Sequence, residues 1–137
     1  MIPVFTPSGS LPPGIWGATV EEIEERFVSN PVRQALFEAF ADVVELLRSA
    51  ECKSMYLDGS FICDEPEPVD YDLCYEPTGM RPTEEFKFFL RLTLEERKNI
   101  YLGDIFIRLP IPPYFLDHVL FWQTDQDGEA KGIIRIE

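Results

Sequence analysis

The chain has 137 residues, enough for one domain with its own core and too few for two. Hydrophobic residues make up 45% of it, including 11 Phe, which excludes a disordered chain. Acidic residues outnumber basic ones by 25 to 12, for a net charge of −13. Because a surface this acidic repels phosphate backbones, the composition argues against non-specific nucleic-acid binding and favours bound cations or a basic partner.

The location of the protein is indicated by what its sequence does not contain. The apolar runs are only a few residues long, which excludes a transmembrane helix and argues against a membrane partner. Residues 1–5 carry neither a basic region nor a long apolar segment, so we expect no signal peptide. The three cysteines are odd in number and lack the spacing of zinc ligands. We therefore expect reduced thiols in a cytoplasmic protein.

The first half of the chain begins with an arm and continues with two helices. Residues 1–17 are rich in Pro and Gly and predict an irregular N-terminal arm. Thr19 and Glu22 have the spacing of a capping box, so a helix should begin there and end near Val28. Asn30-Pro31 is a second helix start, and apolar residues at helical spacing continue this helix to about Ala50.

Strand and loop signals dominate the middle of the chain. Residues 54–58 predict a short strand that ends at Gly59. Residues 64–68 hold two prolines and three carboxylates, which is typical of a loop. Residues 69–75 alternate apolar and polar side chains, so they predict a second strand, with Val69, Tyr71 and Leu73 facing the core.

The remaining segments complete a single domain over residues 1–137. We expect a helix over 83–99, a strand over 104–109, a break at Pro110, Pro112 and Pro113, and two strands over 119–124 and 132–136. The order of elements predicts an α/β (α+β) domain with a short mixed sheet, helices packed on one face and a C-terminal β-hairpin within 118–137.

Two motifs could carry chemistry. Gly59 and Ser60 follow the first strand directly, and a small residue beside a hydroxyl lets backbone N–H groups approach a phosphate. Asp70 and Asp72 are two residues apart on the next strand, so their carboxylates share a face and repel each other unless a cation lies between them. Mg²⁺ binds carboxylates together with substrate phosphates. The alternative is that both aspartates lie on the solvated face of an edge strand.

The segments Leu57-Asp58-Gly59-Ser60 and Val69-Asp70-Tyr71-Asp72-Leu73 together resemble the nucleotidyltransferase superfamily, the DNA polymerase β-like fold. The resemblance covers residues 30–109. That superfamily takes a third carboxylate from a later strand, and Asp104 occupies the matching place. The whole chain also resembles a family of small bacterial proteins with nucleotidyltransferase-like cores, through Leu11-Pro12-Pro13-Gly14 and Phe121-Trp122-Gln123-Thr124-Asp125.

The resemblance implies a site and a reaction. Asp70 and Asp72 would hold two Mg²⁺ or Mn²⁺ ions that bind the triphosphate of an NTP, and Asp104 would complete the second site as ligand or base. Gly59 and Ser60 would cradle the β- and γ-phosphates. One metal would lower the pKa of an acceptor hydroxyl, and the other would neutralise charge on the leaving pyrophosphate.

Two functional hypotheses follow. In the first, the protein transfers a nucleotide from an NTP to a protein or small-molecule acceptor, within a toxin–antitoxin or defence module that includes a partner protein. In the second, it is a catalytically inactive nucleotidyltransferase-fold binding module whose acidic surface engages a basic partner.

Overall fold

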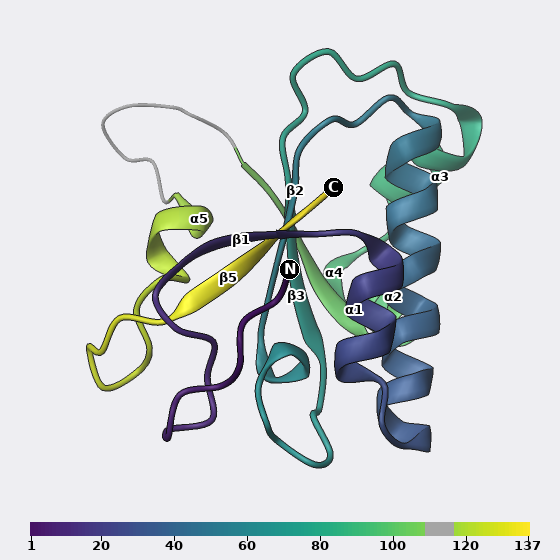
Figure 1. Ribbon diagram of the computed structural model, residues 1–137. Coiled ribbons are helices and arrows are strands. Elements are labelled where there is room, and N and C mark those ends of the chain that lie inside the picture. The colour runs from purple at the N-terminus through teal and green to yellow at the C-terminus, as the bar shows by residue number, and fades with distance from the viewer. Residues whose placement is uncertain (109–116) are drawn as a thin grey trace.

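The computed structural model describes residues 1–108 and 117–137, in which a mixed sheet of five strands forms the centre (Figure 1). The strands lie in the order β1-β5-β2-β3-β4. β2 pairs antiparallel with β3 and with β5, whereas β1 pairs parallel with β5 and β3 pairs parallel with β4. The expected mixed α/β class is therefore confirmed. The strand bounds are Gly14–Ala18 for β1, Met55–Asp58 for β2, Tyr71–Tyr75 for β3, Gly103–Ile107 for β4 and Gly132–Ile136 for β5.

The first two helices begin where their capping residues predict. α1 spans Val20–Phe27, and the Thr19 hydroxyl accepts a hydrogen bond from the Glu22 amide at 3.1 Å. α2 spans Pro31–Ser49, and the Asn30 side chain accepts from the Arg33 amide at 2.9 Å. These caps satisfy amide donors that a helix start leaves without partners.

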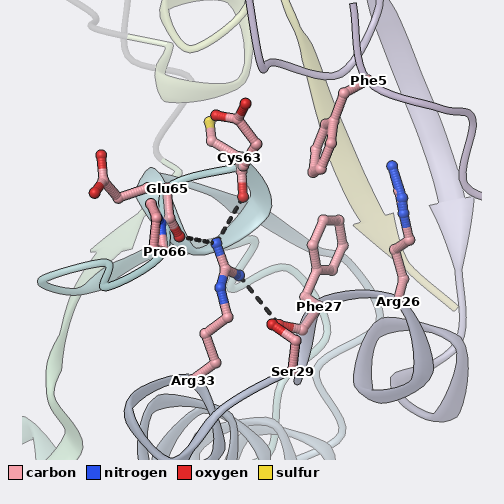
Figure 2. Close-up of a pocket in the computed structure, with 9 residues that line it drawn as sticks. Phe5, Arg26, Phe27, Ser29, Arg33, Cys63, Glu65 and Pro66 are labelled. Carbon is pink, nitrogen blue, oxygen red and sulfur yellow. Dashed lines mark hydrogen bonds between the residues drawn. The ribbon is translucent and has the colours of Figure 1, made fainter.

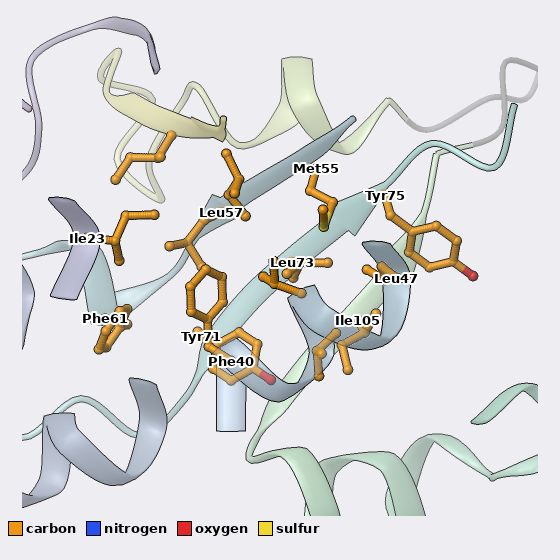
Figure 3. Packing of buried hydrophobic residues seen from close by; sticks show 14 of the residues in the cluster. Ile23, Phe40, Leu47, Met55, Leu57, Phe61, Tyr71, Leu73, Tyr75 and Ile105 are labelled. Carbon is orange, nitrogen blue, oxygen red and sulfur yellow. The ribbon is translucent and has the colours of Figure 1, made fainter. Parts of the chain in front are cut away.

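The core lies between α2 and one face of the sheet (Figure 3). α2 contributes Phe40 and Leu47, both fully buried, to a cluster that the strands complete. Side chains from β2, β3 and β4 alternate between the two faces, which places Leu57, Leu73 and Ile105 against the helices and Asp58, Asp72 and Asp104 on the opposite face. Burial of this apolar area is the main stabilising contribution to the fold.

The single helix expected over 83–99 is wrong: two helices occupy that region, α3 over Glu84–Arg91 and α4 over Leu94–Tyr101. The chain is extended at Thr93, whose hydroxyl accepts from the Glu96 amide while the Glu96 carboxylate accepts from the Thr93 amide. Thr93 therefore starts a new helix by the same capping box that starts α1.

The prediction of an irregular arm over 1–17 is also wrong in part, because the last residues of this segment form most of β1. This strand pairs in parallel with β5, from Gly14 opposite Gly132 to Ala18 opposite Ile136. Trp16 donates a hydrogen bond from its indole nitrogen to the Pro12 carbonyl at 2.8 Å. The partner strand is more than a hundred residues away in sequence, so local Pro and Gly signals concealed the pairing.

The C-terminal hairpin is wrong as well. Residues His118–Phe121 form a short helix, α5, which Asp117 caps, and the expected turn retains only an isolated bridge between Thr124 and Ala130. Val119 and Trp122 pack with Cys74 and Ile133 on the second face of the sheet, so helices cover both faces and not one.

Two further expectations concern the segment around α5 and the membrane. The predicted break at Pro110, Pro112 and Pro113, together with Leu109, lies outside the described residues. Within the described residues, no helix combines the length and the apolar character that crossing a bilayer requires.

Candidate metal centre

Three aspartates converge at one end of the sheet. Asp72 lies in β3 and Asp104 in β4, where the parallel register sets them directly opposite each other. Asp70 immediately precedes β3, and one carboxylate oxygen from each of the three lies within 4.8 Å of the others. The structure thus brings together all three carboxylates that the sequence analysis selected. β3 starts two residues later than the strand predicted over 69–75. Val69 therefore lies outside the strand and is 84% exposed, whereas the sequence analysis placed it in the core.

Tyr71 fixes the register that brings these carboxylates together. Its side chain is fully buried, and its hydroxyl donates a hydrogen bond to the Tyr101 carbonyl at 2.8 Å. The Phe40 ring meets it edge-on, with the ring centroids 5.7 Å apart. Tyr71 lies between Asp70 and Asp72 and therefore anchors β3 in the core. Its hydrogen bond also holds the end of α4, shortly before Asp104, against the same strand.

Gly59 and Ser60 lie against the aspartates. The backbone φ of Gly59 is 97°, and a Cβ there would lie 3.1 Å from the Asp72 amide nitrogen. Both facts favour glycine at this turn. The Ser60 hydroxyl donates to the Asp70 carbonyl at 3.3 Å. The two sequence motifs are therefore adjacent in space, and Ser60 tethers the backbone of one aspartate.

A cation that sequence reasoning missed lies among the carboxylates. The Lys98 ammonium group, carried by α4, lies 2.8 Å from an Asp70 carboxylate oxygen and 3.1 Å from an Asp104 carboxylate oxygen. These hydrogen bonds raise the pKa of Lys98 above its ordinary value. One feature of the sequence could have identified Lys98: it lies on the helix that directly precedes the strand of Asp104.

Of four other basic side chains that could meet a phosphate, the three arginines pair with carboxylates outside the cluster. Arg81 pairs with Glu51 on the surface, Arg135 pairs with Glu137, and Arg108 bridges two carboxylates near α5. Lys131 is the exception in position, because its ammonium group pairs with Asp58 beside the cluster.

Asp58 extends the cluster into a row and was also missed as a site residue. It is the register partner of Asp72 in β2, as Asp104 is in β4, so three aspartates lie side by side across three strands. Asp58 is only 5% exposed. Burial raises its pKa, and the ion pair with Lys131 opposes that effect.

Asp72, in the centre of the row, has the most unfavourable electrostatic environment. Burial, reinforced by the charges of Asp70, Asp58 and Asp104, raises its pKa to about 7. Among the residues that the structure describes, the Asp72 carboxylate has no hydrogen-bond or ion-pair partner. Lys98 instead donates to Asp70 and Asp104, and Lys131 donates to Asp58. The centre of the row is therefore where a further cation would be stabilised most.

The loop after Ser60 is held by a buried arginine. Arg33 donates hydrogen bonds to the carbonyls of Phe27, Phe61, Cys63 and Glu65 at 2.5 to 3.1 Å, part of which Figure 2 shows. The small cavity around it is also lined by Phe5 and Arg26, and both terminal nitrogens of the Arg33 guanidinium group already donate to backbone carbonyls. We assign Arg33 a structural role: it fixes the loop that follows the Gly59 turn.

The residues present fit a hard divalent cation. The donor set consists of carboxylate oxygens from three residues that lie within reach of a common centre. Mg²⁺ and Mn²⁺ prefer such oxygen ligands over nitrogen or sulfur. Exposed acidic groups often cluster without a metal, but here all three carboxylates are partly buried, and burial raises the pKa of the central one.

Fold and site together define an α/β domain with a carboxylate cluster at one end of a mixed sheet. The chain belongs to a family of unknown function, DUF6932, whose profile matches residues 3–137. Comparison with curated proteins gave no match, and comparison with solved structures gave none either.

Proposed function

We propose that this protein is a metal-dependent nucleotidyltransferase that moves a nucleotide from an NTP to a protein or small-molecule acceptor. The observation that carries the proposal is the convergence of Asp70, Asp72 and Asp104 within 4.8 Å beside the Gly59-Ser60 turn. Carboxylates that hold a metal and a close backbone turn that accepts phosphates are what such a reaction requires.

Each residue has a role that its position supports. Asp70, Asp72 and Asp104 would hold Mg²⁺ or Mn²⁺, and the bound ions would activate the acceptor oxygen and neutralise charge on the departing pyrophosphate. The glycine at 59 lets the turn approach the Asp72 backbone closely, which brings the proposed phosphate-binding turn next to the proposed metal ligands. The tether from Ser60 to the Asp70 carbonyl holds the turn and the first ligand at a fixed separation.

The charge of the molecule bears on the acceptor. With a net charge of −13, the chain repels long nucleic acids, so we propose a protein or a small molecule as acceptor. The proposal of a toxin–antitoxin or defence module rests on the resemblance to small bacterial nucleotidyltransferase-like proteins alone. We place the reaction in the cytoplasm, because Cys52, Cys63 and Cys74 are free thiols.

A second candidate function follows from Lys98. Its ammonium group already bridges Asp70 and Asp104, so the cluster has a cation of its own. This observation favours an inactive binding module that engages a basic partner protein through its acidic surface. The two candidates differ in whether an NTP is bound and consumed.

The experiment that tests the proposal is a labelling reaction. The purified protein is incubated with each α-³²P-labelled NTP, Mn²⁺ or Mg²⁺, and a bacterial lysate, and products are separated as proteins and as small molecules. We expect label on an acceptor with the parent protein and with Asp127→Asn, an exposed carboxylate control, but not with Asp72→Asn. If no label and no NTP-dependent thermal shift appear, the binding-module function is supported.

A further inference from the structure

The contact between Lys98 and the carboxylate cluster has a consequence for which ligands the site accepts. We infer that Lys98 is a tethered counter-ion that makes the site select a metal-bound polyphosphate over the free metal ion. The inference rests on the proposed function, because it assumes that Asp70 and Asp104 are metal ligands. It adds to that function a residue that determines specificity.

The ammonium group and a divalent ion compete for the same oxygens. Lys98 donates to Asp70 at 2.8 Å and to Asp104 at 3.1 Å, so it holds two of the three carboxylates that would coordinate a metal. Two cations at these oxygens would repel each other strongly. Lys98 must therefore leave when a metal binds, and it loses two charge-assisted hydrogen bonds in doing so. A free ion that offers nothing in exchange binds weakly.

A polyphosphate supplies what the displaced lysine loses. Lysine is a compact cation with three donors on a flexible stem, and phosphate oxygens suit it. Lys98 is 45% exposed, and beside the carboxylates it lines a shallow groove with Val32, Val69 and Leu102. Its side chain can therefore turn from the aspartates to a neighbouring phosphate without a change in the backbone. The exchange replaces both lost bonds.

The same argument distinguishes Lys98 from the other lysine at the cluster. Lys131 is only 15% exposed and pairs with Asp58, which lies at the far end of the row from Lys98. Lys131 has little room to move, so we expect its ion pair with Asp58 to stabilise the fold and to stay in place when a ligand binds. Lys98 is the more accessible of the two, and among the described residues it is the only cation that pairs with the carboxylates of Asp70 and Asp104.

Isothermal titration calorimetry tests the inference with two ligands, Mn²⁺ alone and an equimolar mixture of Mn²⁺ and inorganic tripolyphosphate. The variants are Lys98→Met and Lys98→Gln, and the control is Lys87→Met. Lys87 is a similarly exposed lysine whose partner, Glu84, lies away from the cluster. We expect both Lys98 variants to bind Mn²⁺ alone about tenfold more tightly than the parent and the Mn²⁺–tripolyphosphate mixture about tenfold more weakly.

The outcomes separate the two proposals. If the parent and both Lys98 variants all fail to bind Mn²⁺ with or without tripolyphosphate, the metal site and the proposed function fail together. If all three bind Mn²⁺ equally, the metal site stands and the role of Lys98 is wrong. If the variants bind both ligands more tightly, Lys98 is only a competitor of the metal, and the selection of polyphosphate is overturned.

Discussion

The ring of Tyr71 lies directly over the backbone of Gly103, the register partner of Tyr71 in β4. A Cβ at position 103 would lie 2.6 Å from the ring carbons. The next pair in the register is Asp72 and Asp104, two of the three carboxylates at the site. The glycine therefore allows a buried aromatic ring to hold the two strands at the point where they present the cluster.

Replacing Gly103 with Ala should destabilise the protein. The ring of Tyr71 is fully buried and bonded at its hydroxyl, so it cannot move aside easily. We expect a loss of about 1–3 kcal/mol in the free energy of unfolding, measured by urea denaturation.

The matched control is Gly17→Ala, at a strand glycine where the new Cβ meets the flexible end of the Glu137 side chain. That variant should stay within about 0.5 kcal/mol of the parent. Equal losses in the two variants would show that Tyr71 does not depend on the glycine.

Replacing Asp72 with Asn should stabilise the metal-free protein at high pH. The folded-state pKa of Asp72 is raised to about 7 by burial and by its acidic neighbours, against about 3.9 in the unfolded chain. Between these values the folded state keeps a proton that the unfolded chain releases. The stability due to this group is therefore fully present below a pH of about 4 and is lost as the pH rises through about 7.

The variant should be more stable than the parent by about 1–3 kcal/mol at a pH of about 8, and this difference should shrink towards a pH of about 4. Urea denaturation of both proteins in metal-free buffers across this range measures the difference. A difference that does not change with pH would contradict the electrostatic account of Asp72.

The buried pair of Lys131 and Asp58 should behave as a coupled unit. Lys131→Met leaves a buried carboxylate without its cation, which should cost about 3 kcal/mol. The double variant with Asp58→Asn should lose less than Lys131→Met alone, because no charge remains buried. Lys87→Met, at an exposed pair, should cost less than about 1 kcal/mol. Additive losses from the two single substitutions in the buried pair would rule out the coupling.

Arg33→Met should loosen the loop after Ser60. Four backbone carbonyls lose their donor, and we expect a loss of about 2–4 kcal/mol in the free energy of unfolding. Hydrogen exchange should increase at the Ile62 and Cys63 amides, which bond within the turn. Arg48→Met is the control, because Arg48 contacts one carbonyl at the exposed C-terminal residue. Exchange that is unchanged in the Arg33 variant would refute its role in the loop.

Local signals were sufficient to predict the helices that begin with a capping side chain. The helix starts at Thr19 and Asn30 follow from side chains that cap within three residues. The spacing of Asp70 and Asp72 put both on one face, and the fold brings Asp104 to them through the parallel pairing of β3 and β4. The family resemblance, and not the local pattern, selected Asp104.

Contacts between distant segments could not be predicted in this way. β1 depends on β5 at the other end of the chain, and α5 is apolar on the side that packs on Cys74 and Ile133, a pattern too short to distinguish from a strand. Lys98 reaches the cluster through the fold and belongs to no motif in the sequence. Asp58 lies in the Leu57-Asp58-Gly59-Ser60 segment, but only the strand pairing shows that it lies beside Asp72. The cations of an acidic site are therefore its least predictable part.

The central claim is that the aspartate cluster binds a divalent cation, and calorimetric titration of the parent protein with Mn²⁺ tests it most directly. Asp72→Asn and Asp104→Asn serve as site variants, and Asp127→Asn, at an exposed turn, serves as the control. We predict saturable binding to the parent and the control, and binding reduced at least about tenfold in both site variants. No saturable binding to the parent at millimolar Mn²⁺, or equal binding to the parent and Asp72→Asn, would contradict the account.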